Sequence, residues 1–306
     1  MHRTTTVDYL LVVDSIFYNG SPQKMNRSDR KIWFIGTGFI WWNMAQDFKD
    51  RSFDVVQYSL GEPYKKNKDK LKWCDTIFVA VPTPTINRKH HDEILYDAIK
   101  NNTHEWQNIV IKSTVKVWTT DKLQNELVDR KLFHSAEFLT EANALNDVKY
   151  PSRNIVGYTE RSQDDAPKVM EILPYSKHNL ITTAKESELW KYMSNFLLTG
   201  KLLLANLIFD LVTFNNIDYN KVAEIAGLDP RIWPSHLQVE WVNWERGACG
   251  HCFPKDLSTL SEMYAEILWD DYEIGKHLLE MLEMYNKNIA QKSWKDQENM
   301  QQILWY

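Results

Sequence analysis

Short apolar runs alternate with amphipathic stretches over roughly the first 180 residues of the chain. Short apolar runs are typical of strands buried in a sheet, and an apolar residue every three or four positions is typical of helices. Their alternation predicts a doubly wound, parallel α/β sheet of the Rossmann type. The expected strands are 32–35, 53–58, 76–81, 108–113, 132–135, 154–158 and 179–182, and the expected helices are 39–49, 119–129 and 162–173.

The pattern changes near Ala184. Residues 186–216 hold one apolar-periodic pattern with no proline and a single glycine, which predicts a helix roughly 45 Å long. Further helices are expected at 221–226, 257–268 and 272–292. We therefore expect an N-terminal extension (1–30), a Rossmann domain (31–183) and an all-helical domain built on the long helix (184–306).

Composition and charge narrow the class of protein. A net charge of −5 argues against bulk binding to nucleic acid. The apolar run 9–13 is too short and too charged to span a bilayer, so no membrane partner is expected. Cys74, Cys249 and Cys252 are too few for a disulfide framework, which favours a cytoplasmic setting.

Glycine and tryptophan occur in unusual numbers. The chain has 10 glycines, well below the usual share of roughly 7%, and 13 tryptophans. Tryptophan is therefore more numerous than glycine, which bears on the motifs below.

The first motif is Gly36-Thr37-Gly38, which follows a predicted strand and precedes a predicted helix. This order begins a dinucleotide fingerprint, in which the glycines make the turn and let a pyrophosphate approach the helix N-terminus. The third glycine position holds Trp41, and Ser59 stands near the place of the acid that binds the ribose. A plain tight strand–helix turn is the alternative interpretation.

The second motif is the loop 247–256, Gly-Ala-Cys-Gly-His-Cys-Phe-Pro-Lys-Asp. Cys252 lies beside a histidine and a lysine at the expected start of a helix, where a thiol pKa is lowered. Such a thiol can capture an aldehyde as a hemithioacetal and pass it on as a thioester. The alternatives are a buried structural thiol and a dithiol redox motif formed with Cys249, although no strand leads directly into it.

Two further clusters carry polar side chains. Residues 90–93, His-His-Asp-Glu, are consecutive, so their side chains diverge, and we expect a solvated helix start and no metal site. Lys191 and Asn195 are four residues apart on the long helix and share a face. They form either an exposed helix face or a pair of donors aimed into a cleft.

Taken together, the motifs resemble the UDP-glucose/GDP-mannose dehydrogenase family of nucleotide-sugar 6-dehydrogenases. The matches run in family order across about residues 31–270. They are Phe34–Gly38 (FIGTG), Val79–Thr85 (VAVPTPT), Lys112–Val115 (KSTV), Glu137–Leu145 (EFLTEANAL), Tyr150–Gly157 (YPSRNIVG), Glu188–Tyr192 (ELWKY) with Asn195, Asp229–Ile232 (DPRI) and Cys252–Asp256 (CFPKD).

The resemblance implies NAD-dependent oxidation of the C6 hydroxyl of a nucleotide sugar (a UDP-sugar or GDP-mannose) to the uronate, with a dimer formed through the long helix. It implies Cys252 as the nucleophile, Lys191 and Asn195 as oxyanion stabilisers, Glu141 as the hydrolytic base, and Thr114 and Asp256 as residues that hold water and protons. The implied cofactor-binding residues are Gly36, Thr37, Gly38, Thr83, Ser113 and Lys255, and the implied substrate-binding residues are Phe138, Leu139, Gly247 and Gly250.

The chain also departs from the family pattern. Family members usually continue into a C-terminal α/β domain that helps to hold the nucleotide, so the chain resembles a short form. Tryptophan stands where the family has glycine at Trp41 and Trp233, and Lys116–Trp118 replaces a Pro-Gly turn. Ser59 in place of the acid costs about 1–3 kcal/mol if that contact is lost.

Two other functions remain open. A Rossmann domain followed by a helical domain also describes β-hydroxyacid and 6-phosphogluconate-type dehydrogenases, which need no cysteine. The chain can also be an inactive scaffold or binding module that keeps the fold. A Cys249–Cys252 disulfide that blocks the nucleophile is a further hypothesis.

Overall fold

The computed structural model describes residues 30–36, 38–137, 139, 143–240, 245–250, 252–268 and 272–293, without the side chains of residues 39–41. The chain forms two compact units. The first contains residues up to 81, 95–113 and 117–188, and the second contains 82–94, 114–116 and 189 onward.

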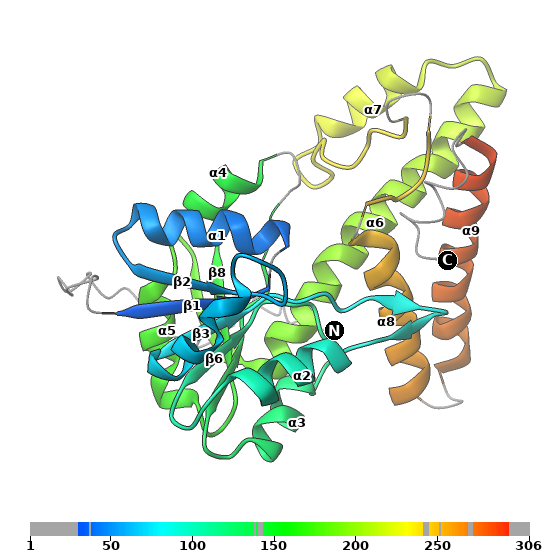
Figure 1. Cartoon of the computed structure of the whole chain (residues 1–306). Coiled ribbons are helices and arrows are strands. Elements are labelled where there is room, and N and C mark those ends of the chain that lie inside the picture. Colours follow the sequence, from blue (N-terminus) through cyan, green and yellow to red (C-terminus); the bar gives the residue numbers. More distant parts are fainter. Residues whose placement is uncertain are drawn as a thin grey trace, which may run out of the picture. The chain divides into compact units, whose positions relative to one another are not determined.

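The first unit is built on a seven-stranded sheet with the order β2-β1-β3-β6-β7-β8-β9 (Figure 1). Its strands are β1 (Lys31–Ile35), β2 (Asp54–Tyr58), β3 (Thr76–Val79), β6 (Asn108–Ile111), β7 (Lys131–His134), β8 (Asn154–Tyr158) and β9 (Asn179–Thr183). The predicted Rossmann-type α/β fold is confirmed. The prediction of a fully parallel sheet is wrong at one place, because β7 and β8 pair antiparallel. A continuous apolar run reports burial on both faces and does not encode strand direction.

Helices cover both faces of this sheet, and Figure 1 shows α1 and α4 on one side and α2 and α3 on the other. The helices of this unit are α1 (Phe39–Asp50), η2 (Lys65–Trp73), α2 (Glu93–Asn102), α3 (Thr119–Glu126), α4 (Ala144–Lys149), η3 (Gln163–Asp165) and α5 (Ala166–Ile172). Sequence periodicity missed η2 and α4, which are short and have few apolar positions.

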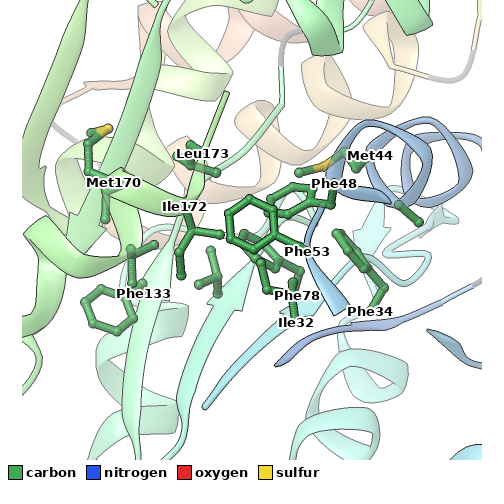
Figure 2. Close-up of a cluster of buried hydrophobic side chains, with 14 of the residues drawn as sticks. Ile32, Phe34, Met44, Phe48, Phe53, Phe78, Phe133, Met170, Ile172 and Leu173 are labelled. Carbon is green, nitrogen blue, oxygen red and sulfur yellow. The ribbon is translucent and has the colours of Figure 1, made fainter. Parts of the chain in front are cut away.

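Aromatic residues form much of the core under α1 (Figure 2). The Phe34 ring stacks on Phe78 with centroids 5.2 Å apart, and Phe48 meets both rings at 5.4 Å. Strand alternation explains the arrangement, because Ile32 and Phe34 point to this core while Trp33 between them points to the other face. The core therefore fixes the strand that leads into the glycine turn.

In its described residues, the second unit contains a short hairpin and four helical segments. They are β4 (Thr85–Ile86), β5 (Lys89–His90), the part of α6 (Ala184–Phe214) from residue 189 onward, α7 (Tyr219–Gly227), α8 (Phe253–Ile267) and α9 (Glu273–Ser293). The predicted long helix is confirmed as α6, and Pro254 lies in the first turn of α8. The domain limits given above remain predictions.

Among the described residues, α6 is long and apolar enough to cross a membrane by length and composition, with a third of the relevant window buried. Core helices of soluble proteins meet the same criterion. Lys191, Asn195 and Asn206 are buried polar residues along α6, which is more typical of a protein core than of a lipid-facing helix.

Candidate functional site

The turn after β1 requires glycine at residue 36. Gly36 has a φ of +127°, and a Cβ built on it would lie 2.1 Å from the carbonyl oxygen of Ala80. Its N–H donates to the carbonyl oxygen of Tyr58 at 3.1 Å, which closes the turn against the end of β2. Any side chain at this position would force the neighbouring strand ends apart.

Gly38 serves a different purpose at the N-terminus of α1. It has an ordinary backbone conformation, and none of the described atoms outside its chain neighbours lies within 4 Å of where its Cβ would be. No side chain caps α1, and its first turn holds no acidic residue. An open surface beside uncapped helix N–H groups fits the pyrophosphate of a dinucleotide.

The end of β2 is where ribose recognition is expected. Ser59 is 6% exposed there, and its hydroxyl donates to the carbonyl oxygen of Gly61 at 3.2 Å. The hydroxyl is therefore engaged in its own turn, in the place where an acid is expected. The described turn fits the pyrophosphate of NAD and lacks the carboxylate that recognises its ribose.

Alanine substitutions at Gly36 and Gly38 separate these two roles. We expect Gly36→Ala to lower the free energy of unfolding by at least about 2 kcal/mol, because of the clash and the left-handed backbone. Gly38→Ala should leave the unfolding free energy within about 0.5 kcal/mol and weaken NAD binding about tenfold, because a methyl group would fill the space beside the helix N-terminus. Urea denaturation and calorimetric titration with NAD measure the two quantities, and equal stability losses in both variants would contradict the assignment.

The other described candidates in the first unit lie near the ends of β3, β6 and β7. The Ser113 hydroxyl donates to the carbonyl oxygen of Val81 at 2.7 Å and accepts from its N–H at 3.0 Å, so it joins two loops. Leu139 lines a cavity of about 150 Å³ together with Lys112, Glu137 and Arg153. Burial lowers the pKa of Arg153 in this cavity.

Glu188, in the first turns of α6, is a fully buried carboxylate that the sequence analysis did not single out. It accepts hydrogen bonds from the N–H of Trp118 at 2.7 Å, the N–H of Thr120 at 2.8 Å and the Thr120 hydroxyl at 2.6 Å. It thereby caps α3 from a distant part of the chain. Burial raises the pKa of Glu188 to about 7, although these hydrogen bonds oppose the shift.

Three predicted site residues meet in the second unit. The Asp256 carboxylate, 2% exposed, accepts from the Asn195 amide at 2.5 Å through one oxygen and from the Lys255 ammonium at 2.5 Å through the other. Asn195 comes from α6, and the other two residues come from α8. A buried carboxylate with both oxygens bonded in this way is fixed in position.

Cys252 occupies the N-cap position of α8 without a capping hydrogen bond from its side chain, and it is exposed. Its carbonyl oxygen accepts from the Asp256 N–H at 2.8 Å, so the thiol stands one helical turn from the fixed carboxylate. Position at a helix N-terminus favours the thiolate form. The interpretation of Cys252 as a buried structural thiol is therefore wrong.

The loop before α8 is fastened to α9 by Asn286. This fully buried amide donates to the carbonyl oxygen of Ala248 at 2.9 Å and accepts from its N–H at 2.7 Å. Gly247 and Gly250 flank the contact with φ of +100° and +82°, where glycine is favoured. The sequence analysis missed Asn286, although an amide on the apolar face of an amphipathic helix is a usable signal.

The remaining candidates of the second unit lie near the hairpin and on α6. The Thr83 hydroxyl donates to the carbonyl oxygen of Thr114 at 2.7 Å, which brings a predicted cofactor residue to a predicted catalytic one. Lys191 is 4% exposed. The interpretation of Lys191 and Asn195 as an exposed helix face is therefore wrong, because both side chains are buried.

His90 corrects the expectation of a solvated cluster at 90–93. Helix α2 does begin at Glu93, but both ring nitrogens of His90 are buried and have no hydrogen-bond partner in the described part of the chain. Burial, with the positive charges of Lys255 and Lys116, lowers the pKa of His90 to about 3. His90 is thus a neutral imidazole electrostatically coupled to the Lys255–Asp256 pair, and consecutive sequence position gave no sign of this.

Several candidates cannot be placed. Thr37, Phe138, Glu141 and His251 lie outside the described residues, as does the side chain of Trp41. None of the three cysteines forms a disulfide. The described residues contain no group of three or more His, Cys, Asp or Glu that could hold a metal ion. The functional roles of the candidate residues remain predictions.

Comparison with known proteins identifies relatives of this chain. A putative UDP-glucose 6-dehydrogenase of Bacillus subtilis, YtcA, is 30% identical over 205 residues, which are 63% of this chain and 47% of that protein. The chain spans about half the length of the curated relatives it matches.

Two solved structures share the fold. A UDP-glucose dehydrogenase from Pyrobaculum islandicum superposes with a TM-score of 0.75 at 20% identity, over 87% of this chain and 70% of that one. A 3-hydroxyisobutyrate dehydrogenase from Mycobacterium tuberculosis gives a TM-score of 0.64 at 12% identity, over 85% and 95% of the two chains. The fold is thus shared by both classes of dehydrogenase considered above.

Family models decide between these classes. Residues 62–173 match the NAD binding domain of the UDP-glucose/GDP-mannose dehydrogenase family, and residues 185–288 match its central domain. The first match implies NAD as the cofactor. Because the two matches together cover more than half of the chain, this protein belongs to the UDP-glucose/GDP-mannose dehydrogenase family.

Proposed function

We propose that this protein oxidises the C6 hydroxyl of a nucleotide sugar to the uronate, with NAD as the oxidant and Cys252 as a covalent nucleophile. The observation that carries the proposal is the arrangement at the start of α8. The exposed Cys252 stands at the N-cap position of α8, one turn before a carboxylate held by Asn195 and Lys255.

The thiol is required between the two oxidations. NAD, when bound, accepts the hydride that leaves C6 in each oxidation. The first oxidation turns the alcohol into an aldehyde and releases a proton. The Cys252 sulfur then adds to the carbonyl carbon, which forms a C–S bond and places a proton on oxygen to give a thiohemiacetal. The second oxidation converts this adduct into a thioester, and water releases the uronate and restores the thiol.

Four further side chains are assigned to these steps. We assign Lys191 and Asn195 to stabilising the oxygen that becomes negative, which is usually a large electrostatic contribution. Both are buried, so little water competes with them. Asp256 fixes the Asn195 amide through a hydrogen bond, and we assign Glu141 to activating the hydrolytic water.

We assign the binding of the cofactor to the two glycines of the turn after β1 and to three polar residues. Gly36 and Gly38 fit the pyrophosphate, and we assign Thr83, Ser113 and Lys255 to further contacts. Two nucleotide-sugar classes, UDP-sugars and GDP-mannose, fit the proposal equally.

A direct test mixes the purified chain with NAD and either UDP-glucose, UDP-N-acetyl sugars or GDP-mannose, and follows NADH absorbance. The expected result is two NADH for each sugar consumed, with the uronate identified by mass spectrometry. Flat traces with every sugar, together with no calorimetric binding of NAD, would refute the proposal.

A second candidate function is a binding module without turnover, and the Ser59 turn favours it. The Ser59 hydroxyl is engaged with Gly61, so a ribose contact there is replaced by an internal one. Under this candidate, calorimetry gives no heat with millimolar NAD. Binding of a nucleotide sugar without turnover would also support it.

We further propose that a second copy of this chain covers one face of α6. Apolar side chains between 49% and 59% exposed recur along that face at intervals of three, four and seven residues. They are Leu189, Met193, Leu197, Leu204, Leu207 and Leu211. A continuous exposed apolar stripe of this kind marks an interaction surface.

Introducing positive charge into this stripe gives a prediction. Lysine at both Leu204 and Leu211 is expected to weaken dimerisation at least about tenfold, because each contact would bury an unpaired ammonium. Light scattering after gel filtration measures the mass of the species. Lysine at Leu60, which is 82% exposed in the first unit, is the control and should leave a dimer. A wild-type monomer, or partition of wild type into lipid vesicles, would contradict the assignment of α6.

A further inference from the structure

Three tryptophans have backbone conformations that ordinarily belong to glycine. Trp106, Trp118 and Trp233 have φ of +61°, +78° and +60°. The left-handed region is disfavoured for residues with a Cβ, and a bulky residue there is a marked outlier. Glycine enters it without steric cost. One such tryptophan would be an exception, whereas three in one chain suggest a common cause.

These indoles are also exposed to an unusual degree. Trp106 is 58% exposed, Trp118 is 46% exposed and Trp233 is 65% exposed. Tryptophan is highly buried on average in folded proteins. The side chains therefore contribute little packing that could offset the backbone strain.

The backbones at these positions, in contrast, have defined roles. The Trp106 N–H donates to the carbonyl oxygen of Asp129 at 2.7 Å. The Trp118 N–H, at the start of α3, donates to the carboxylate of Glu188. The Trp233 carbonyl oxygen accepts from the Lys201 ammonium at 2.5 Å. At each position the backbone makes a hydrogen bond, whereas the exposed indole adds little packing, as expected of a position that suits glycine.

A fourth tryptophan is buried instead of exposed, and its indole lacks a polar partner. Trp33 is 1% exposed in the centre of β1, and its indole N–H has no hydrogen-bond partner among the described residues. Buried indole N–H groups usually find an acceptor.

Composition points the same way. The chain has 10 glycines and 13 tryptophans, and the two together make up about 7% of 306 residues. That share is ordinary for glycine alone. The shortage of glycine matches the excess of tryptophan.

We propose that the native polypeptide carries glycine at positions 106, 118 and 233, because its gene uses there a codon that its own ribosomes decode as glycine. The codon UGA has this property in general, since some genetic codes read it as tryptophan and others as glycine. The same reading at residue 41 would restore the third glycine of the dinucleotide fingerprint. This proposal does not depend on the proposed enzymatic function.

Peptide masses of the protein purified from the cells that carry its gene test the proposal. Trypsin cleavage gives the peptides 101–112 and 117–122, which contain Trp106 and Trp118 as their sole tryptophans, and 232–246, in which fragment-ion masses separate position 233 from Trp241 and Trp244. The expected masses are those with glycine at all three positions. Tryptophan at any of them overturns the proposal.

His236 provides an internal control in the third peptide. It has a φ of +62°, close to that of Trp233, and a bulky side chain. A decoding effect leaves it as histidine. Glycine at His236 as well would overturn the codon explanation, because a general preference for glycine at left-handed positions would then account for the result.

A recombinant series gives a second, independent readout. We expect Trp106→Gly and Trp233→Gly each to raise the melting temperature by roughly 2–4 °C, since strain is relieved and little packing is lost. Trp118→Gly should gain less, because the Lys185 ammonium lies 4.5 Å from the Trp118 ring centroid. Tyr175→Gly is the matched control, an aromatic residue that is 83% exposed with an ordinary backbone, and should give no rise. Falls in melting temperature equal to that of the control would count against the proposal.

Discussion

Alanine at Cys252 is expected to abolish uronate formation, with a loss of at least about a thousandfold in kcat. Without the sulfur no thiohemiacetal can form, so the aldehyde cannot be carried into the second oxidation. The first oxidation needs no thiol. Mass spectrometry of the products should therefore detect at most the aldehyde or its hydrate, with NADH formed in a ratio of one rather than two per sugar consumed.

Cys249→Ser is the matched control for this experiment. Cys249 lies three residues away in the same loop and is partly buried, so its replacement tests for disturbance of the loop itself. Its turnover should stay within about threefold of wild type, as expected of a residue outside the chemistry. Unchanged uronate formation in Cys252→Ala would contradict the cysteine mechanism and favour a hydroxyacid-type dehydrogenase. A Cys249 variant as inactive as the Cys252 variant would also contradict the assignment, because the loop rather than one thiol would then be essential.

Alanine at Glu188 should cause the largest loss of stability, about 3–5 kcal/mol in the free energy of unfolding. The carboxylate accepts three hydrogen bonds from Trp118 and Thr120 at 2.6–2.8 Å and is fully buried. Its removal leaves buried N–H groups without an acceptor, each of which costs about 1–3 kcal/mol. Urea denaturation measures the loss. Glu126→Ala on α3 is the control, because Glu126 is 49% exposed in a surface ion pair, and it should cost less than about 1 kcal/mol.

The raised pKa of Glu188 adds a pH dependence. Burial raises the pKa to about 7 from the usual 4.5, so the folded state binds the proton more tightly than the unfolded state. Stability from this group is therefore greatest below about pH 4.5, falls as pH rises towards 7, and is constant above. The expected difference is about 3 kcal/mol. Glu188→Gln cannot titrate, so the stability difference between wild type and this variant should change between pH 5 and pH 8. An equal difference at both pH values would show that the carboxyl does not titrate in this range.

Much of the fold could be read from the sequence, because strand burial and helix periodicity are local properties. The long helix α6 and the strands of the first unit followed from apolar spacing alone. The antiparallel pairing of β7 with β8 did not, because both strands are buried runs and the pattern carries no direction. The helix η2 was missed because Leu71 is its only buried residue.

The candidate site was predictable where chemistry is concentrated in a short segment. The thiols, glycines and charged residues of the 247–256 loop identified it as a candidate site. Residues that act from other elements did not, because their role depends on long-range contacts. Asn286 and Glu188 look ordinary in their local sequence, and only the folded chain shows them buried against Ala248 and α3. His90 belongs to a visible polar cluster, but only the folded chain shows that it contacts α8.

The Asn286 contact determines which positions of the loop are free to vary. The two hydrogen bonds of its amide go to the main chain of residue 248. The contact therefore holds the loop without depending on the loop's side chains. Replacements at Cys249 can then alter reactivity while the loop keeps its path. Position 286, which looks like part of a structural helix, would tolerate far fewer residues than the loop it supports. A mutational scan of this protein would thus find that position 286, on α9, tolerates fewer substitutions than position 249 in the loop before α8.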